Sequence, residues 1–301
     1  MPKNKSIIRQ VQEALKQKLC IGAQKHVAKQ QGVASDGIYS WSTYQNYLSK
    51  ACAFAKWARE NHDCKTLGDA RTHVDAYLKM HINQSYSPYT QKLIACSIAK
   101  VYGCSTKDFT PTQVRHRANI TRSRRGKAIF SETKNKEFVD FCKSTGLRRH
   151  ELTQLKPENL HFDETTGNYM LVNIKGKGGR LRDCPVLSKG AVERIQNTPD
   201  GQKVWDKIPS RADIHSYRAE YCKTLYERHA RPISAIPKNE RYYCRGDLSG
   251  VVYDKRAMLI ASRALGHNRI SVIAGHYLYS CGAEEQTQCA NAPFTPMQVT
   301  T

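Results

Sequence analysis

The sequence has 301 residues, and its 48 Lys and Arg against 26 Asp and Glu give a formal net charge of +22. Such an excess of positive charge indicates a polyanionic partner, either a nucleic acid or an acidic membrane surface. Because no apolar run is long enough to span a bilayer and the basic start lacks the apolar stretch of a signal peptide, we expect no membrane partner and a cytoplasmic location.

The cysteines favour a reducing compartment. Eleven cysteines are scattered singly from Cys20 to Cys289, with no CxxC pair and an odd total. The local cluster of His62 and Cys64 lacks the second pair of ligands that a structural zinc requires. We therefore expect no metal site.

Charge is distributed unevenly along the chain. Residues 1–127 carry 22 basic and 7 acidic side chains, whereas residues 128–301 carry 26 and 19. The first part is thus the stronger candidate for binding a phosphate backbone. We predict a basic extension over 1–38, a helical domain over 39–110, a basic linker over 111–127, a second domain over 128–282 and a tail over 283–301. The sequence leaves three roles for the extension: a further DNA-binding element, a simple tail, or a helix that covers the fold.

Three helices are predicted in the first part, each with an apolar stripe and a polar, partly basic face. The first covers 42–62 with Ser42 as its N-cap, the second covers 66–82, and the third covers 87–103. The alternative is a small helical bundle whose charges are only solvated. The shortage of acidic residues exceeds what solubility needs, which favours a binding role.

The predicted linker, residues 111–127, contains six cations and no acidic residue. These cations are Arg115, Arg117, Arg122, Arg124, Arg125 and Lys127. A flexible tether is the alternative, since linkers are commonly polar. A tether does not need so many cations, however, and we predict a strap that lies along DNA phosphates.

The second part mixes helices with strands. A helix is predicted over 131–146, ended by Gly146, and a β-hairpin over 167–187 with GKGG as its turn. Three further helical patterns follow over 188–198, 213–230 and 254–267. The prediction is a mainly α protein with a small antiparallel β-sheet.

Polar motifs follow one another along this second part. They are Arg148 and Glu151 in TGLRRHE, Lys177 in GKGG, His215 and Arg218 in HSYR, His267 in LGH, and then a tyrosine. Each motif alone is weak, because such short patterns arise by chance in basic proteins. Their order, over residues 128 to about 280, resembles the tyrosine recombinase (phage integrase) family. The wording SRALGHNRISVIAGHYL looks closest to integrases of prophages and conjugative elements.

The resemblance implies a fold and a partner. Residues from Ser40 to Phe109 look like the family's helical core-binding domain, on pattern rather than on motif. Together with an α+β catalytic domain, this domain would form a clamp around double-stranded DNA. The family's reaction stores the energy of the broken phosphodiester in a phosphotyrosine bond, so the resemblance implies neither ATP nor a metal as cofactor.

The resemblance also implies a role for each motif. Two arginines, Arg148 and Arg218, would neutralise the non-bridging oxygens of a phosphodiester, a bidentate role that suits guanidinium groups. His215 would accept or orient the proton of the attacking phenol, whose reference pKa is about 10. His267 would donate a hydrogen bond to the phosphate.

Two further residues complete this set. Lys177, carried by the hairpin turn, would protonate the leaving 5′-oxygen as general acid. Glu151 would support the fold of the site without reacting. An ordinary glutamate on a helix surface is the alternative for Glu151.

Two tyrosines compete for the role of nucleophile. The family spacing after the LGH histidine lands on His276; Tyr277 is one residue later and Tyr279 two beyond it. An insertion of one residue in the preceding loop is a small change, whereas Tyr279 would turn well around a helix. We therefore predict Tyr277 as the nucleophile, with Tyr279 and Tyr253 as packing aromatics.

The chain also departs from the family pattern. Tyr217 and Ala219 replace the residues that are frequent in HxxR, and 48 residues separate Arg218 from His267. The extra length falls at about 230–255. It is either a DNA-contacting insertion or a surface excursion.

The most favoured function is a site-specific DNA recombinase that integrates or excises a mobile element through a 3′-phosphotyrosyl intermediate. Exchange between two duplexes requires a homotetramer on paired sites, with accessory DNA-bending proteins as further partners. The alternatives are a catalytically inactive DNA-binding accessory protein on the same fold and an enzyme resembling type IB topoisomerases.

Overall fold

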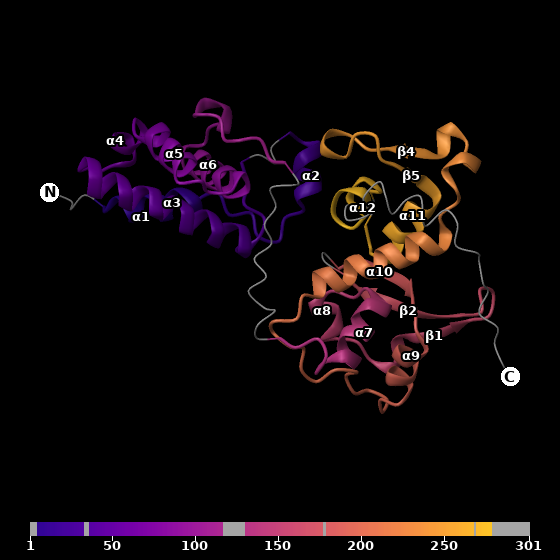
Figure 1. Cartoon of the computed structure of the whole chain (residues 1–301). Coiled ribbons are helices and arrows are strands. Elements are labelled where there is room, and N and C mark those ends of the chain that lie inside the picture. Colours follow the sequence, from indigo (N-terminus) through magenta and orange to yellow (C-terminus); the bar gives the residue numbers. More distant parts are fainter. Residues whose placement is uncertain (1–4, 33–35, 117–129, 177–178, 268, 279–301) are drawn as a thin grey trace. The chain divides into compact units, whose positions relative to one another are not determined.

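A computed structural model of the chain describes residues 5–32, 36–116, 130–176, 179–267 and 269–278, apart from the side chain of His26. The chain divides into two compact units, residues 1–121 and 122–301. Each unit has its own hydrophobic core. Figure 1 shows the helices and strands of both units.

The first unit is helical. Its elements are α1 (Ile7–Lys16), α2 (Lys25–Gln30), α3 (Trp41–His62), α4 (Leu67–Arg71), α5 (Val74–Asn83), α6 (Pro88–Tyr102) and the 3-10 turn Thr106–Asp108. Helix α1 contacts both α3 and α6, and it buries Ile7, Val11 and Leu15 in the shared core. Helix α1, which belongs to the predicted extension over 1–38, is therefore part of the fold and covers its core.

Two details of this unit differ from the sequence prediction. The N-cap of helix α3 lies two residues earlier than predicted, because the Ser40 hydroxyl, not that of Ser42, accepts the N–H of Thr43 at 3.2 Å. The second predicted helix is two helices, α4 and α5, which are separated at Thr72 and His73. Both helices bury apolar residues in the same core, so the apolar stripe predicted for one helix is divided between two short ones.

The second unit combines helices with two small sheets. Its helices are α7 (Lys136–Thr145), α8 (Arg149–Leu152), α9 (Lys189–Gln196), α10 (Ile214–His229), α11 (Lys255–Ala264) and α12 (Ser271–His276). Its strands are β1 (Leu160–Asp163), β2 (Asn168–Lys175), β3 (Leu181–Pro185), β4 (Arg241–Tyr243) and β5 (Val252–Asp254). The predicted architecture, mainly α with a small antiparallel sheet, is confirmed, and the structure adds a second antiparallel sheet, β4–β5, that was not predicted.

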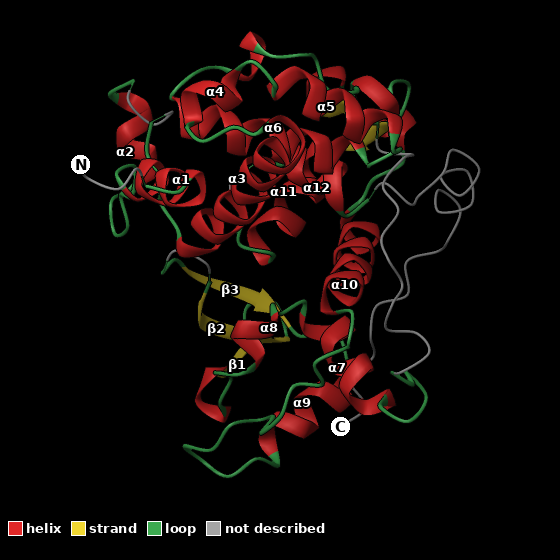
Figure 2. Ribbon diagram, turned by 90° about the vertical axis from the view of Figure 1, so that its left-hand side faces the viewer, coloured by secondary structure: helices red, strands yellow, loops and turns green. Residues whose placement is uncertain are grey.

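The larger sheet has the antiparallel order β1-β2-β3. The predicted hairpin is its β2–β3 part, whereas β1 was not predicted from the sequence. Strand β3 alternates between exposed and buried positions, which turns Arg182 and Cys184 inward. Helix α11 contacts this strand, and helix α10 contacts both α7 and α11. As Figures 1 and 2 show, α10 thus lies between the layer that contains α7 and the layer that contains α11.

The extra length before α11 is folded. It contains three 3-10 turns and the two-stranded β4–β5 sheet. Arg231 ties it together by binding Asp254 at 2.8 Å and Glu240 at 2.6 Å. Tyr253, predicted as a packing aromatic, is 2% exposed and donates to the carbonyl of Leu278.

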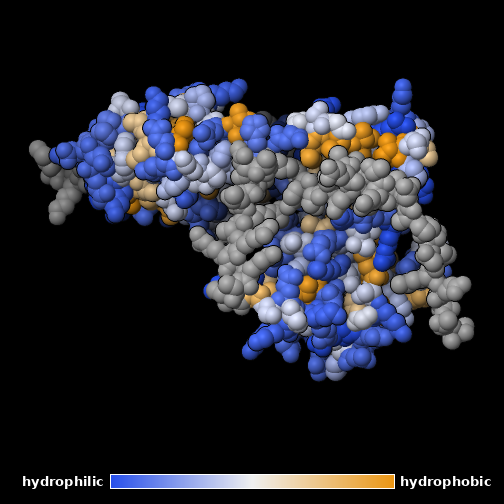
Figure 3. Space-filling model, viewed as in Figure 1, coloured by the Kyte–Doolittle hydropathy of each residue, from blue (hydrophilic) through white to orange (hydrophobic). Residues whose placement is uncertain are grey.

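On the face shown in Figure 3, hydrophilic residues predominate and hydrophobic ones lie among them. In the part of the chain that the structure describes, no helix has the length and apolarity needed to cross a membrane.

Candidate active site

The ends of several helices in the second unit lie close together and form the candidate site. Helix α7 ends at Gly146, whose φ of +58° is left-handed, and α8 begins just after Arg148. A Cβ at Gly146 would lie 2.3 Å from the ring of Tyr221, so the residue has to be glycine for both reasons. This stop allows the chain to turn and direct Arg148 toward the end of α11, where it contacts Leu265.

Glu151 fixes the position of Arg148. Its Oε2 accepts the N–H of Arg148 at 2.7 Å, and its Oε1 accepts from Nη1 of the same arginine at 2.8 Å. The Glu151 side chain is 1% exposed and that of Arg148 is 28% exposed. Burial alone would raise the pKa of the Glu151 carboxyl, but Arg182 and the N–H of Arg148 hold it below its ordinary value. The carboxylate is thus ionised and orients an arginine that solvent can still reach.

Arg218 is the buried arginine of the site. It lies one turn into α10 and is 2% exposed. Its Nη1 donates to the carbonyl of Gly146 and its Nη2 to that of Leu265, while Nε donates to the hydroxyl of Tyr277 at 3.3 Å. Arg148 Nη2 also donates to Leu265, at 3.2 Å. The two predicted arginines therefore meet at the end of α11.

His267 and Tyr277 share a hydrogen bond. Nε2 of His267 lies 3.1 Å from the Tyr277 hydroxyl, which is the same oxygen that Arg218 contacts. Arginine has no acceptor, so Nε of Arg218 donates to this oxygen. Nε2 of His267 accepts the phenolic proton in the tautomer that carries its own hydrogen on Nδ1. Burial, followed by the charge of Arg218 and other arginines, lowers the pKa of His267 to about 4. The imidazole is therefore neutral near pH 7 and has a lone pair for this proton.

The turn that carries His267 is fixed by its own backbone. The N–H of His267 donates to the carbonyl of Ser262 at 2.8 Å, and the Ser262 hydroxyl donates back to the carbonyl of His267 at 2.9 Å. Ser262 is completely buried. The LGH motif thus closes α11 with a rigid turn.

Of the other predicted site residues, His215 lies near this centre. The ring of His215, an exposed residue in the first turn of α10, has its centroid 5.6 Å from that of Tyr277. Lys177 and Tyr279 lie outside the described residues. Gly176, next to Lys177, is close: a Cβ there would lie 3.4 Å from Glu151 Oε1 and 3.6 Å from Arg148 Nη1. The hairpin turn therefore starts beside the arginines.

The predicted basic strap is mostly outside the described residues, which include Arg115 but not Arg117, Arg122, Arg124, Arg125 or Lys127. Arg115 belongs to the first unit, is exposed, and lies over the ring of Tyr89 with 5.4 Å between its guanidinium carbon and the ring centroid.

Arg182 is a member of the site that the sequence motifs did not include. Its Nη2 donates to Glu151 Oε2 at 2.7 Å and its Nη1 to the carbonyl of Ala264. The signal in the sequence was a cation at an inward-facing position of the β-hairpin, two residues before the buried Cys184.

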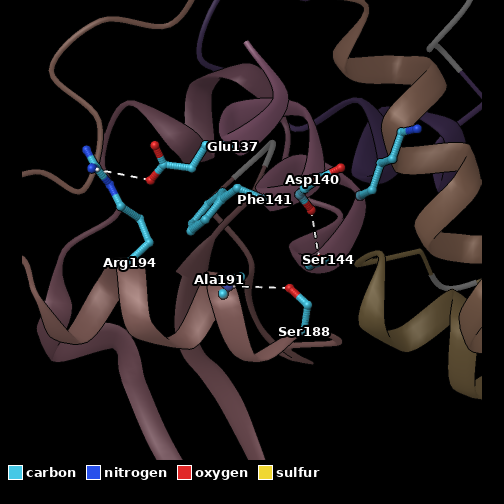
Figure 4. A pocket seen from close by; sticks show the side chains of 9 residues that line it. Glu137, Asp140, Phe141, Ser144, Ser188, Ala191 and Arg194 are labelled. Atoms are coloured by element: carbon cyan, nitrogen blue, oxygen red, sulfur yellow. Dashed lines mark hydrogen bonds and ion pairs between the residues drawn. The ribbon is translucent and has the colours of Figure 1, made fainter. Parts of the chain in front are cut away.

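A hollow elsewhere in the unit holds none of these residues. Its volume is about 430 Å³, and it lies between α7 and α9 (Figure 4). Arg194 and Glu137 on its wall form an ion pair at 3.4 Å, so these charges neutralise each other. Among the described residues, no group of three or more His, Cys, Asp or Glu is placed to hold a metal ion.

Comparison with known proteins gives distant structural likenesses. No protein-family model and no curated protein matches the chain. The chain is similar to the crystal structure of XerA recombinase, with 14% identity, a TM-score of 0.32, and coverage of 94% of this chain and 100% of that one. It is also similar to the Tn1549 transposon integrase (residues 82–397) in complex with circular intermediate DNA, with 11% identity, a TM-score of 0.45 and coverage of 94% and 98%.

A second structure of that integrase, with transposon right end DNA, matches with 11% identity, a TM-score of 0.42 and coverage of 94% and 99%. These likenesses are too distant to assign an activity, which has to be inferred from the side chains of the site.

Proposed function

We propose that the chain is a tyrosine-type site-specific DNA recombinase that cleaves and rejoins DNA through a covalent bond to Tyr277. The observation that carries this proposal is the position of the Tyr277 hydroxyl, which lies 3.3 Å from Nε of Arg218 and 3.1 Å from Nε2 of His267. A phenol between a guanidinium and a neutral imidazole has both a cation that stabilises the developing phenolate and a base that takes its proton.

The reaction begins with a phosphodiester near Arg148, the arginine of the pair that solvent reaches. The two arginines neutralise the charge on the non-bridging oxygens, which lowers the barrier to attack by an oxygen nucleophile. The Tyr277 oxygen bonds to phosphorus and its proton passes to a histidine. The bond from phosphorus to the 5′-oxygen breaks, and this oxygen takes a proton from Lys177. Attack of a 5′-hydroxyl on the phosphotyrosine reverses these steps and rejoins a strand.

The contacts favour His267 over His215 as the first proton acceptor. The rings of both histidines lie at similar distances from that of Tyr277, with centroids 5.5 Å away for His267 and 5.6 Å away for His215. The distance that favours His267 is the 3.1 Å between its Nε2 and the Tyr277 hydroxyl. In this scheme His215 orients the phenol. Glu151 holds Arg148 in place in this scheme through the hydrogen bond to Nη1.

Binding and assembly follow from the same proposal. The first unit and the 111–127 strap supply much of the excess positive charge, and both units would clamp one duplex. Exchange of strands between two duplexes needs four cleavage events, so single-tyrosine subunits would act as a tetramer on paired sites. Integration or excision of a mobile element is the biological setting that fits this activity.

The test is the covalent adduct. Duplexes that the protein binds are selected from a random pool, nicked near the centre of the site, and incubated with the full-length protein. We expect a denaturation-resistant protein–DNA adduct that forms equally well in EDTA. Tight binding without an adduct would instead indicate an accessory DNA-binding protein. Relaxation of supercoiled DNA without exchange between two sites would indicate a topoisomerase.

A further inference from the structure

Arg182 has contacts that reach both halves of the proposed site. It lies on β3, its side chain is 5% exposed, and it binds Glu151 Oε2 at 2.7 Å. Its Nη1 donates to the carbonyl of Ala264, which is 82 residues later in the chain. One side chain therefore connects the carboxylate that orients Arg148 with the helix end that precedes His267.

The second contact is at a helix C-terminus, where carbonyls lack partners within the helix and the dipole is negative. Helix α11 ends at Ala264, and Leu265 is its C-cap. The carbonyl of Ala264 accepts from Arg182, and that of Leu265 accepts from both Arg148 and Arg218. Arg182 thus satisfies one of these carbonyls, and the other arginines share the next.

The backbone is shaped to admit Arg182. Gly266 has a φ of +67°, and a Cβ at this position would lie 2.6 Å from Cδ of Arg182. The stem of the arginine therefore passes directly against the residue before His267. A bulkier turn could not form here with Arg182 in place.

Arg182 also affects the phosphate-binding side chains, through Glu151. Its Oε2 lies 2.7 Å from Arg182 and 4.0 Å from Arg218, while its Oε1 binds Arg148. With Arg182 occupying Oε2, the carboxylate is fixed in the plane that directs Oε1 to Arg148. Without Arg182, this buried carboxylate would turn toward the remaining cations, because an ionised group that loses a buried partner seeks another.

We infer that Arg182 is a positioning residue of the proposed DNA-cleaving site, which holds Arg148 through Glu151 and holds the turn of His267 through the carbonyl of Ala264. This inference rests on the proposed function. Arg182 itself need not touch the DNA. A purely structural role, in which the buried ion pair only stabilises the unit, is the alternative that the test has to exclude.

The test compares two versions of one nicked duplex, with either a phosphate or an uncharged methylphosphonate at the cleaved position. Cleavage of the methylphosphonate develops one negative charge less and depends less on well-placed guanidinium groups. We expect Arg182→Met to slow adduct formation on the phosphate about 100-fold, the loss typical of a small displacement of catalytic groups. On the methylphosphonate duplex, the factor by which Arg182→Met slows adduct formation should be at least about 10-fold smaller than on the phosphate duplex. We expect the same reduction for Arg148→Ala.

A matched control is Arg149→Met. Arg149 donates to the carbonyls of Pro209, Ser210 and Ala212, so it too is an arginine that binds backbone oxygens in this unit. Its loss should lower the stability of the fold and change both cleavage rates by the same factor. Arg182→Lys, which keeps the charge, should fold and show an intermediate change in the ratio of the two rates.

A double-mutant cycle gives a second measurement. Because Arg182 acts through Arg148, Arg182→Met should cost much less in the Arg148→Ala background than in the wild-type background. Additive losses, or equal losses on both duplexes for Arg182→Met and Arg182→Lys, would overturn the inference. The proposed function is tested separately: if the wild-type protein forms no adduct at all, the proposed function fails, whatever the Arg182 variants do.

Discussion

The hydroxyl of Tyr277 lies 3.1 Å from Nε2 of His267, which is ten residues earlier in the chain. The turn after α11 and the short helix α12 bring these two side chains together. The same hydroxyl contacts Arg218, which is 59 residues away. The phenol is thus held by groups from separate helices of one unit.

The first prediction concerns this hydroxyl. Tyr277→Phe should abolish the protein–DNA adduct and leave the affinity for DNA within about twofold, because only the nucleophilic oxygen is removed. Loss of the buried hydrogen bonds should lower the free energy of unfolding by about 1 kcal/mol. The adduct is measured on denaturing gels and the stability by chemical denaturation. Tyr279→Phe is the control; if it loses the adduct and Tyr277→Phe keeps it, the assignment is wrong.

The second prediction concerns the pKa of His267. Burial and the neighbouring arginines lower the pKa of His267 to about 4, so its imidazole should titrate near pH 4 in the free protein. The unfolded chain takes up this proton near the ordinary pKa of about 6.5. Between these two values the unfolded state binds more protons, so the free energy of unfolding should fall as the pH drops from about 6.5 to 4.

The measurement is an NMR titration of histidine-labelled protein, assigned with His267→Gln. The same variant should lose part of the pH dependence of stability that the wild-type protein shows over this range. Titration of His267 near the ordinary histidine value would contradict the prediction, because it would mean that burial and the neighbouring arginines do not lower its pKa.

The third prediction concerns Gly266. Gly266→Ala places a Cβ 2.6 Å from Cδ of Arg182 and strains a φ of +67°. We expect a loss of about 2 kcal/mol in the free energy of unfolding. The control is Gly201→Ala, with a φ of +76° and nothing within 4 Å of the new Cβ, which isolates the backbone strain from the clash. Equal losses in the two variants would mean that Arg182 moves aside at little energetic cost.

The local turns of the candidate site follow from short sequence motifs. TGLRRHE, HSYR and LGH each specify a helix end or a single turn, and these turns place Arg148, Arg218 and His267. The pairing of these turns was not predictable from the residues themselves. Arg148 donates to Leu265, 117 residues away, and a contact of this kind depends on how helices pack. Its place in the site was expected only through the resemblance to a family.

The contacts of Arg182 could not be predicted from the sequence either. Strand periodicity places it on the inward face of the hairpin, but periodicity does not say which carboxylate or carbonyl it meets there. The break between α4 and α5 was missed for a related reason. The apolar stripe continues through both helices, and the stop at Thr72 and His73 has no glycine or proline to mark it.

The fourth prediction concerns the basic strap. Replacing Arg122, Arg124 and Arg125 with Ala should weaken binding to all DNA sequences by a similar factor and flatten the salt dependence, by about 0.9 in slope for each lost phosphate contact. Affinity is measured by fluorescence anisotropy over a range of salt concentrations. The control replaces Lys136 and Lys189, exposed lysines that pair with acidic residues one helical turn away. An unchanged slope in the strap variant would mean that the segment is only a linker.

The last prediction is that each protomer cleaves with its own tyrosine. Tyr277 and Arg218 of one chain already contact each other at 3.3 Å, so the nucleophile needs no second chain to reach the arginines. A mixture of Tyr277→Phe with Arg148→Ala should therefore form almost no adduct, because every protomer lacks either the nucleophile or an arginine. Mixtures of each variant with the wild-type protein, made with chains of different tagged lengths, serve as controls and should give adducts of wild-type chains only. Recovery of an adduct that carries the Arg148→Ala chain in the mixture of the two variants would contradict cleavage in cis. Such a result would mean that Tyr277 leaves Arg218 of its own chain and attacks a phosphate bound by its neighbour.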